Sequence, residues 1–149
     1  MDQETYKKNV EKDIELIQKY SKLVDYYFSK FNVGCETCYS KTEKQFYPIY
    51  NNLWNIIHSL PFKLNINISA NYRIKKLIIE FYTKFKSLPC KICKTHYDKF
   101  LINRPLRMLR NNYDLQIWTL NLHNDVNRRL NKRLFTYNAS KQKYINLYI

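Results

Sequence analysis

The stretch Pro89-Cys90-Lys91-Ile92-Cys93-Lys94-Thr95-His96-Tyr97 places two cysteines, with two residues between them, at the start of a predicted helix. Proline suits the first turn of a helix, because the N–H that it lacks has no partner there. The exposed N–H groups of that turn stabilise a thiolate through the positive end of the helix dipole. We therefore expect Cys90 and Cys93 to be reactive. Together with His96, they also have the ligand types and spacing of half a zinc site.

The amino-acid composition favours an all-α fold. The chain has 149 residues, enough for one domain with a core, but only one glycine and four prolines. Tight turns in β-sandwiches, Gly-rich phosphate loops and dinucleotide-binding βαβ units need more glycine than this. The composition argues against these three classes.

The formal net charge of +14 is weak evidence for a nucleic-acid partner. The basic residues are scattered, and the high content of Lys, Asn, Ile and Tyr is typical of a genome-wide coding bias. We expect no nucleic acid partner. No apolar run is long enough to span a bilayer, and the first residues lack the apolar core of a signal peptide. We therefore expect a soluble protein that is not secreted by the usual signal.

The four cysteines form two Cys-x-x-Cys pairs, Cys35/Cys38 and Cys90/Cys93. In a chain without a signal peptide, such pairs indicate metal ligands or redox dithiols. The first pair follows Gly34, which could cap a helix, and precedes a polar run. We interpret residues 35–47 as a mobile arm that carries a dithiol. A static disulfide at the end of the preceding helix is the alternative.

Apolar residues at helical spacing predict the other elements. An amphipathic helix fills most of residues 1–34 and packs on the domain or forms a coiled coil. Further helices are predicted at residues 48–60, where Pro61 is the stop, at 70–88, from Pro89 to 103, and at 114–134. Residues 138–149 form a basic tail. The apolar stripes are Val10, Ile14, Ile17, Val24, Phe28 and Phe31; Tyr50, Leu53, Trp54 and Ile57; Ile74, Leu77, Ile78, Phe81, Phe85 and Leu88; and Leu115, Trp118, Leu122, Val126 and Leu130.

Three blocks resemble the flavin-linked sulfhydryl oxidases of the Erv/ALR type. The blocks are Trp54-x-x-x-His58, Pro89-Cys90-x-x-Cys93, and His123-Asn124-Asp125-Val126-Asn127 followed by Lys132. They occur in the family's order, within residues 48–137. The resemblance implies a helical bundle, a four-helix core plus a short helix, that holds FAD without a Rossmann unit.

The resemblance also implies roles for single residues. Cys93 would lie against the flavin, and Cys90 would receive the incoming electrons. No metal ligand is implied. The implied cofactor-binding residues are Trp54 and His58 at the flavin, His123, Asn124, Val126, Asn127 and Lys132 at the adenine and phosphates, and Phe135 at a family aromatic position.

Two positions depart from the family pattern. Leu88 stands where the family often has a tyrosine, and Asn131 stands where it has a glycine. The four cysteines leave none for the additional structural disulfides of many members. This reduced pattern is similar to that of short viral members and indicates a large DNA virus as the source. We then expect a cytoplasmic assembly site or the virion as the compartment, and otherwise the mitochondrial intermembrane space.

The resemblance implies an electron path that starts at reduced protein substrates. Electrons would pass through Cys35/Cys38, inferred here as a shuttle, to Cys90/Cys93, then to FAD and oxygen, and the product would be hydrogen peroxide. A homodimer is typical of the family.

The main alternative is a zinc-binding module that uses all four cysteines and has a basic nucleic-acid-binding surface. The separation of Cys38 from Cys90 is longer than in common zinc ribbons or fingers, and neither pair has a glycine knuckle. A thioredoxin-like oxidoreductase would need a βαβ frame, and purely structural disulfides would leave the His123 to Lys132 block unexplained.

Overall fold

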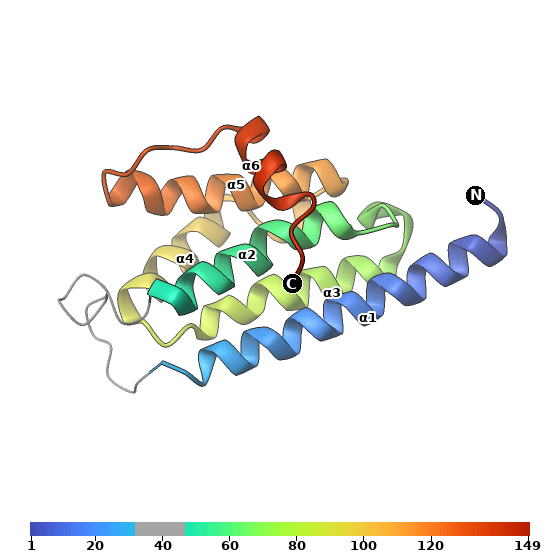
Figure 1. The fold of residues 1–149 in the computed structure, drawn as a ribbon, viewed down its shortest axis with the longest axis horizontal. Coiled ribbons are helices and arrows are strands. Elements are labelled where there is room, and N and C mark those ends of the chain that lie inside the picture. The colour runs from blue at the N-terminus through green and yellow to red at the C-terminus, as the bar shows by residue number, and fades with distance from the viewer. Residues whose placement is uncertain (32–46) are drawn as a thin grey trace.

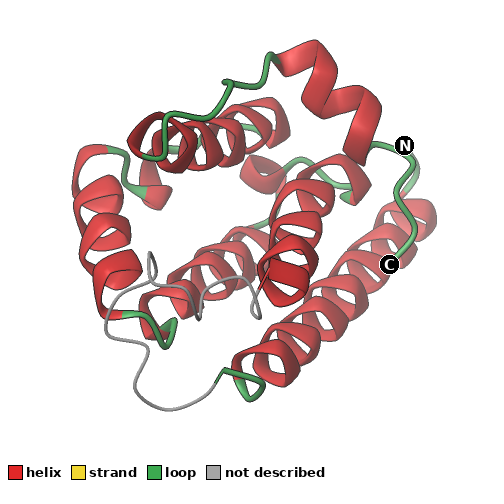
Figure 2. Cartoon of the chain, turned by 60° about the vertical axis from the view of Figure 1, so that its left-hand side comes forward, coloured by secondary structure: helices red, strands yellow, loops and turns green. Residues whose placement is uncertain are grey.

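The computed structural model describes residues 1–31 and 47–149, and every regular element in these two ranges is helical (Figure 2). The α-helices of this described part are α1 (Gln3–Phe28), α2 (Tyr47–Lys63), α3 (Tyr72–Thr83), α4 (Lys91–Asn103), α5 (Asn112–Arg129) and α6 (Tyr137–Tyr144). Short 3-10 turns occur at η2 (Ile68–Ala70), η3 (Lys84–Ser87) and η4 (Leu106–Met108). The all-α prediction is confirmed.

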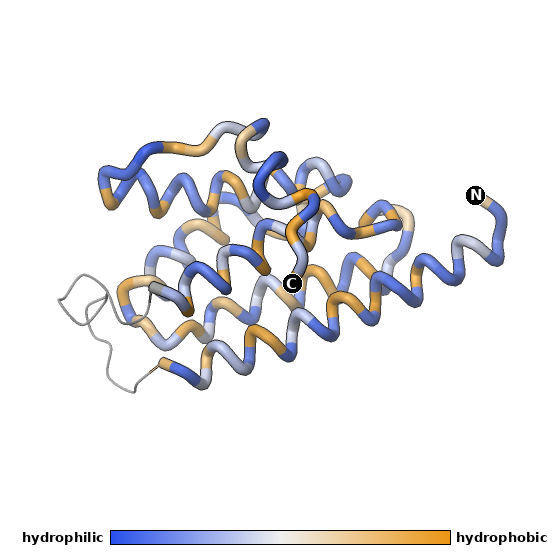
Figure 3. The backbone as a smooth tube through the Cα atoms, in the orientation of Figure 1, coloured by the Kyte–Doolittle hydropathy of each residue, from blue (hydrophilic) through white to orange (hydrophobic). Residues whose placement is uncertain are grey.

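Helix α2 is the centre of the bundle. It packs against α1, α5 and α6, and α1 also packs along α3 (Figure 1). The first helix thus lies on the bundle rather than apart from it. Hydrophobic and hydrophilic positions alternate along the helices (Figure 3). The core combines Ile14, Ile17, Tyr20 and Val24 of α1 with Leu53, Ile56 and Leu60 of α2, Ile74, Ile78 and Phe81 of α3, and Leu115, Trp118 and Leu122 of α5.

Side-chain caps explain where the helices begin. Asp2, Asn71, Asn111 and Thr136 each accept a hydrogen bond from the backbone N–H three residues later. Such caps satisfy N–H groups that have no partner inside the helix.

The predicted stop at Pro61 is wrong, because α2 continues to Lys63. A proline inside a helix has no N–H to donate to the carbonyl four residues earlier, here that of Ile57. The hydroxyl of Tyr82 donates to this carbonyl instead, at 2.8 Å. Burial raises the pKa of Tyr82 well above its ordinary value, so the hydroxyl keeps its proton. A tertiary contact from α3 thus replaces the missing hydrogen bond.

The end of α5 also differs from the prediction, since the helix stops at Arg129 and not near residue 134. Asn131 has a φ of 55°, in the left-handed region. The backbone N–H of Lys132 then donates to the carbonyl of Asn127 at 2.8 Å. This is the geometry of a Schellman cap, whose left-handed position usually holds glycine and sometimes asparagine. It explains why asparagine can replace the family's glycine here.

A buried carboxylate fastens α1 to the loop after α2. Asp13 is fully buried and accepts hydrogen bonds from the backbone N–H groups of Asn65 and Ile66, at 2.9 and 2.8 Å. The side chain of Asn112 continues this junction, because it donates to the carbonyl of Ile66 and accepts from the N–H of Ile68. At the other end of α1, Lys84 of η3 pairs with Asp25 at 2.9 Å.

The described helices include none that is both long enough and apolar enough to cross a membrane.

Candidate functional site

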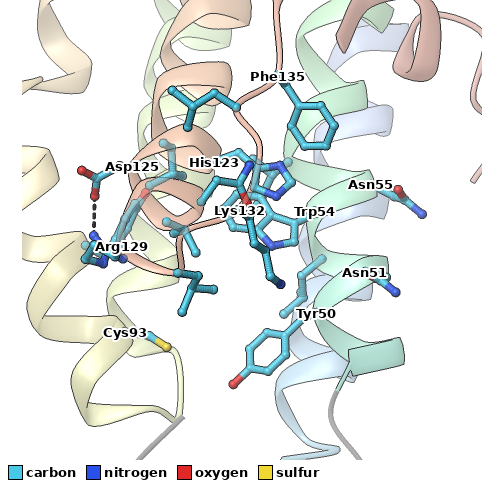
Figure 4. Close-up of a pocket in the computed structure, with 18 of the residues that line it drawn as sticks. Tyr50, Asn51, Trp54, Asn55, Cys93, His123, Asp125, Arg129, Lys132 and Phe135 are labelled. Atoms are coloured by element: carbon cyan, nitrogen blue, oxygen red, sulfur yellow. Dashed lines mark hydrogen bonds and ion pairs between the residues drawn. The ribbon is translucent and has the colours of Figure 1, made fainter. Parts of the chain in front are cut away.

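A cavity of about 1000 Å³ opens between α2, α4, α5 and the segment that leads into α6 (Figure 4). Its wall includes Trp54 from α2, Cys93 from α4 and His123 from α5. Lys132 and Phe135 follow α5, and Lys143 comes from α6. Residues that lie far apart in the sequence therefore share one wall. The volume is at the upper end of the range that is usual for cofactor pockets.

The turn that carries Cys90 and Cys93, called here the reactive turn after its predicted role, lies at the base of this cavity. Cys90 is the N-cap of α4, and its sulfur accepts a hydrogen bond from the backbone N–H of Cys93 at 3.3 Å. Pro89 therefore precedes the helix. The prediction that it stands in the first turn is wrong. In this structure Cys90 is disulfide-bonded. When reduced, a sulfur in this position at the N-terminal turn would be stabilised as a thiolate. Cys90 is buried, whereas Cys93 is partly exposed and lines the cavity.

Two stacked rings form a flat aromatic wall. Trp54 and His123 have ring centroids 3.9 Å apart and planes 4° from parallel. The ring of Phe135 also contacts His123, with centroids 5.1 Å apart and planes tilted by 57°. Figure 4 shows these three side chains together at the cavity. The wall joins α2, α5 and the chain after α5, and it offers a surface on which an aromatic ligand can pack.

His58 lies behind this wall and does not line the cavity. It is fully buried, and its Nε2 is 2.8 Å from Nδ1 of His123. The ring of Tyr144 stacks on His58, with centroids 4.3 Å apart and planes 7° from parallel. The predicted pair Trp54 and His58 thus divides into one residue at the cavity surface and one residue that supports it.

Burial keeps both of these histidines neutral at pH 7. It lowers the pKa of His123 to about 4, and the positive charges of Lys143 and Lys132 act in the same direction. Burial also lowers the pKa of His58 well below its ordinary value, with further contributions from His123 and Lys143.

Cations gather on the cavity wall near the end of α5. Lys132, Arg133 and Lys143 all line it. Arg129 also lines it, and its guanidinium forms an ion pair with Asp125 (Figure 4). An aromatic wall beside a group of cations is suited to a ligand that carries both a ring system and phosphate groups.

The predicted block after His123 divides into residues that line the cavity and one that does not. Val126 and Asn127 line it, and the buried Nδ2 of Asn127 has no hydrogen-bond partner in the structure. Asn124 faces elsewhere: its Nδ2 donates to the carbonyl of Phe135 at 2.9 Å, and its Oδ1 accepts from the N–H of Phe135 at 2.8 Å. Asn124 therefore holds Phe135 in place.

The predicted residues Cys35 and Cys38 lie outside the described residues. Sequence reasoning did not assign a site role to Lys143 or Tyr144 in the basic tail. The only signal in the sequence was the helical spacing of Tyr144, Leu147 and Tyr148. The sequence could not show their role, because it depends on the packing of α6 against α2. Within residues 1–31 and 47–149, no three His, Cys, Asp or Glu side chains come together as a metal site would require.

Comparison with known proteins agrees with this geometry. Residues 51–145 match the model of the Erv1/Alr family. The chain is 34% identical over 92 residues to the FAD-linked sulfhydryl oxidase of African swine fever virus. The aligned region covers 61% of this chain and 75% of the viral protein. It is 30% identical over 90 residues to a probable FAD-linked sulfhydryl oxidase of Acanthamoeba polyphaga mimivirus, covering 56% of this chain and 59% of that protein.

No solved structure matches the chain. The family match covers the aromatic wall, the reactive turn and the helix that contributes Tyr144. The chain belongs to the Erv1/Alr family.

Proposed function

We propose that this chain is an FAD-linked sulfhydryl oxidase that forms disulfide bonds in protein substrates. Family membership and the names of the viral relatives support this function. The observation that carries the proposal is that Cys93 lines the same cavity as the stacked rings of Trp54 and His123. A reactive sulfur and a surface for an aromatic cofactor are therefore parts of one site.

The residues of the cavity fit FAD. Trp54, His123 and Phe135 provide aromatic surface, and Lys132 and Lys143 provide positive charge for phosphate groups. The buried Nδ2 of Asn127, which has no partner, offers a hydrogen-bond donor to an acceptor atom of the cofactor. When bound, FAD supplies the electron-acceptor chemistry: it takes two electrons from a dithiol and passes them to oxygen, which becomes hydrogen peroxide.

The cysteines transfer electrons by thiol–disulfide exchange. A thiolate of the substrate attacks the Cys35–Cys38 disulfide, and a second substrate thiol resolves the mixed disulfide, so the substrate loses two electrons and two protons. The reduced Cys35 and Cys38 then reduce a Cys90–Cys93 disulfide in the same way. Cys93 is the flavin-proximal residue in this scheme, since it lines the cavity, and Cys90 is the interchange residue.

The absorption spectrum of the purified protein tests this function. A flavin spectrum should bleach when a dithiol is added without air, and should recover with release of hydrogen peroxide when air is admitted. The variant Cys93→Ser should keep the bound flavin but lose the bleaching. A colourless protein that cannot be loaded with FAD, and that contains stoichiometric zinc, would instead support the four-cysteine zinc module.

The proposal extends to the assembly and to the compartment. We propose a homodimer, as is typical of the family, and a cytoplasmic site of virus assembly or the virion, because the relatives named above come from viruses. Analytical ultracentrifugation tests the dimer, and imaging of the tagged protein in infected cells tests the compartment. A monomer at micromolar concentration would contradict the first proposal, and a mitochondrial signal would contradict the second.

A further inference from the structure

The buried contact between His58 and His123 restricts where their protons can lie. Nε2 of His58 and Nδ1 of His123 are 2.8 Å apart, which is a hydrogen-bond distance. Burial keeps both rings neutral, so each ring carries one N–H and one bare nitrogen. One ring must therefore donate and the other accept.

Only two arrangements satisfy this contact. In the first, His58 donates from Nε2, so Nδ1 of His58 is bare and His123 carries its proton on Nε2. In the second, His123 donates from Nδ1, so His58 carries its proton on Nδ1 and Nε2 of His123 is bare.

The surroundings of His58 favour the first arrangement. Its Nδ1 is fully buried and has no hydrogen-bond partner. An orphaned N–H in the protein interior is rarer than an acceptor without a donor, and the second arrangement would create such an N–H. The first arrangement also uses the Nε2–H form in both rings, which is the more stable form of free histidine.

The neighbouring rings hold both imidazoles in fixed planes. Tyr144 stacks on His58, and Trp54 stacks on His123. Since Nδ1 of His123 is occupied by His58, Nε2 is the atom of His123 that is left for a ligand, and His123 lines the cavity.

We propose that His58 is a positioning residue that fixes His123 as an Nε2–H donor toward an acceptor atom of the bound cofactor. This inference rests on the proposed function, because it takes FAD as the occupant of the cavity. The partner of His123 must then be an acceptor, such as a carbonyl, a hydroxyl or phosphate oxygen, or a bare ring nitrogen. His58 is fully buried and does not line the cavity.

Nitrogen-15 NMR of the cofactor-free protein reads the protons directly. The chain has only three histidines, so the spectrum contains three imidazole rings, and single substitutions assign them. We expect Nε2 to carry the proton in both His58 and His123, with Nδ1 bare in each. Protonated Nδ1 atoms in these two rings would overturn the proposal, whatever the variants show.

Cofactor affinity gives the second measurement. His58→Phe keeps a ring but removes the donor, so Kd for FAD should rise about tenfold, the equivalent of ~1.4 kcal/mol for one hydrogen bond. His58→Gln keeps an amide donor and should recover part of the affinity. The matched control is Ser59→Ala, which removes a neighbouring buried polar group and should leave Kd unchanged.

Two outcomes separate this inference from the proposed function. If the unaltered protein binds FAD but His58→Phe binds it equally well, the positioning role is wrong and the oxidase function stands. If the unaltered protein does not bind FAD, the proposed function fails and this inference fails with it.

Discussion

The buried carboxylate of Asp13 accepts a 2.8 Å hydrogen bond from the backbone N–H of Ile66, 53 residues away in the sequence. It also accepts from the backbone N–H of Asn65. Asp13→Ala would leave these N–H groups without a partner, so we expect the free energy of unfolding to fall by about 3 kcal/mol. Urea unfolding measures this loss, and Glu15→Ala on the exposed face of the same helix is the control. Equal urea midpoints for the two variants would show that the hydrogen bonds to Asp13 contribute nothing to the free energy of unfolding.

The contact between Tyr82 and Ile57 predicts a coupling with Pro61. Tyr82→Phe removes the donor to the Ile57 carbonyl and should lower the free energy of unfolding by about 1–2 kcal/mol. Pro61→Ala restores a backbone N–H that can donate to the same carbonyl, so it should stabilise the Tyr82→Phe protein more than the unaltered protein. A double-mutant cycle measures the difference. Additive effects would mean that Tyr82 does not substitute for the missing N–H.

The neutral histidines predict a loss of stability in mild acid. The pKa of His123 is lowered from 6.5 to about 4, and that of His58 is lowered well below 6.5. The unfolded chain therefore binds protons before the folded chain does as the pH falls below 6.5. The free energy of unfolding should fall over this interval, by about 1.4 kcal/mol per pH unit for each histidine, and the slope should end for His123 near pH 4.

Urea unfolding of the cofactor-free protein at pH 7, 6 and 5 measures this slope. The carboxylates of Asp2 and Asp114 have lowered pKa values, so their contribution is lost below pH 3.8, outside this interval. A variant with glutamine at both His58 and His123 should keep only the smaller slope that His96 contributes, since the pKa of His96 is also lowered. A stability that does not change between pH 7 and pH 5 would contradict the prediction.

The proposed shuttle predicts a difference between large and small substrates. Replacing Cys35 and Cys38 with serine should slow the oxidation of a reduced protein, because a folded substrate cannot reach the cavity, and should spare the oxidation of dithiothreitol. Oxygen consumption measures both rates. Ser40→Ala in the same polar run is the control. Full activity on the protein substrate without the pair would show that Cys35 and Cys38 are not a shuttle.

The left-handed residue after α5 predicts an order of stability among variants. Glycine adopts a positive φ without steric cost, so Asn131→Gly should be at least as stable as the unaltered protein. Asn131→Val should be less stable by about 1–2 kcal/mol, because a branched side chain clashes in this region. FAD affinity should fall in the same variant, since Lys132 follows directly. Thermal unfolding and FAD titration test both effects, and a valine variant of unchanged stability would contradict them.

The sequence was sufficient for the features that depend on local pattern. Periodicity predicted the helices, and the short motifs predicted that Trp54, Cys93 and His123 belong to one site. The three residues line the same cavity, which is consistent with that prediction. The features that local pattern did not reveal depend on contacts between distant residues. Pro61 does not end its helix because Tyr82 reaches across from α3. His58 lies behind the wall because the rings of His123 and Tyr144 enclose it.

The two tryptophans give the protein an internal optical reporter. Trp54 lies in the cavity wall against His123, whereas Trp118 is buried in the core with its indole N–H bonded to the carbonyl of Arg104. A flavin that enters the cavity would quench the fluorescence of Trp54 more strongly than that of Trp118. In a Trp54→Phe protein, the emission of Trp118 would instead follow unfolding of the core. Cofactor uptake and folding can therefore be followed separately by the light that the chain itself emits.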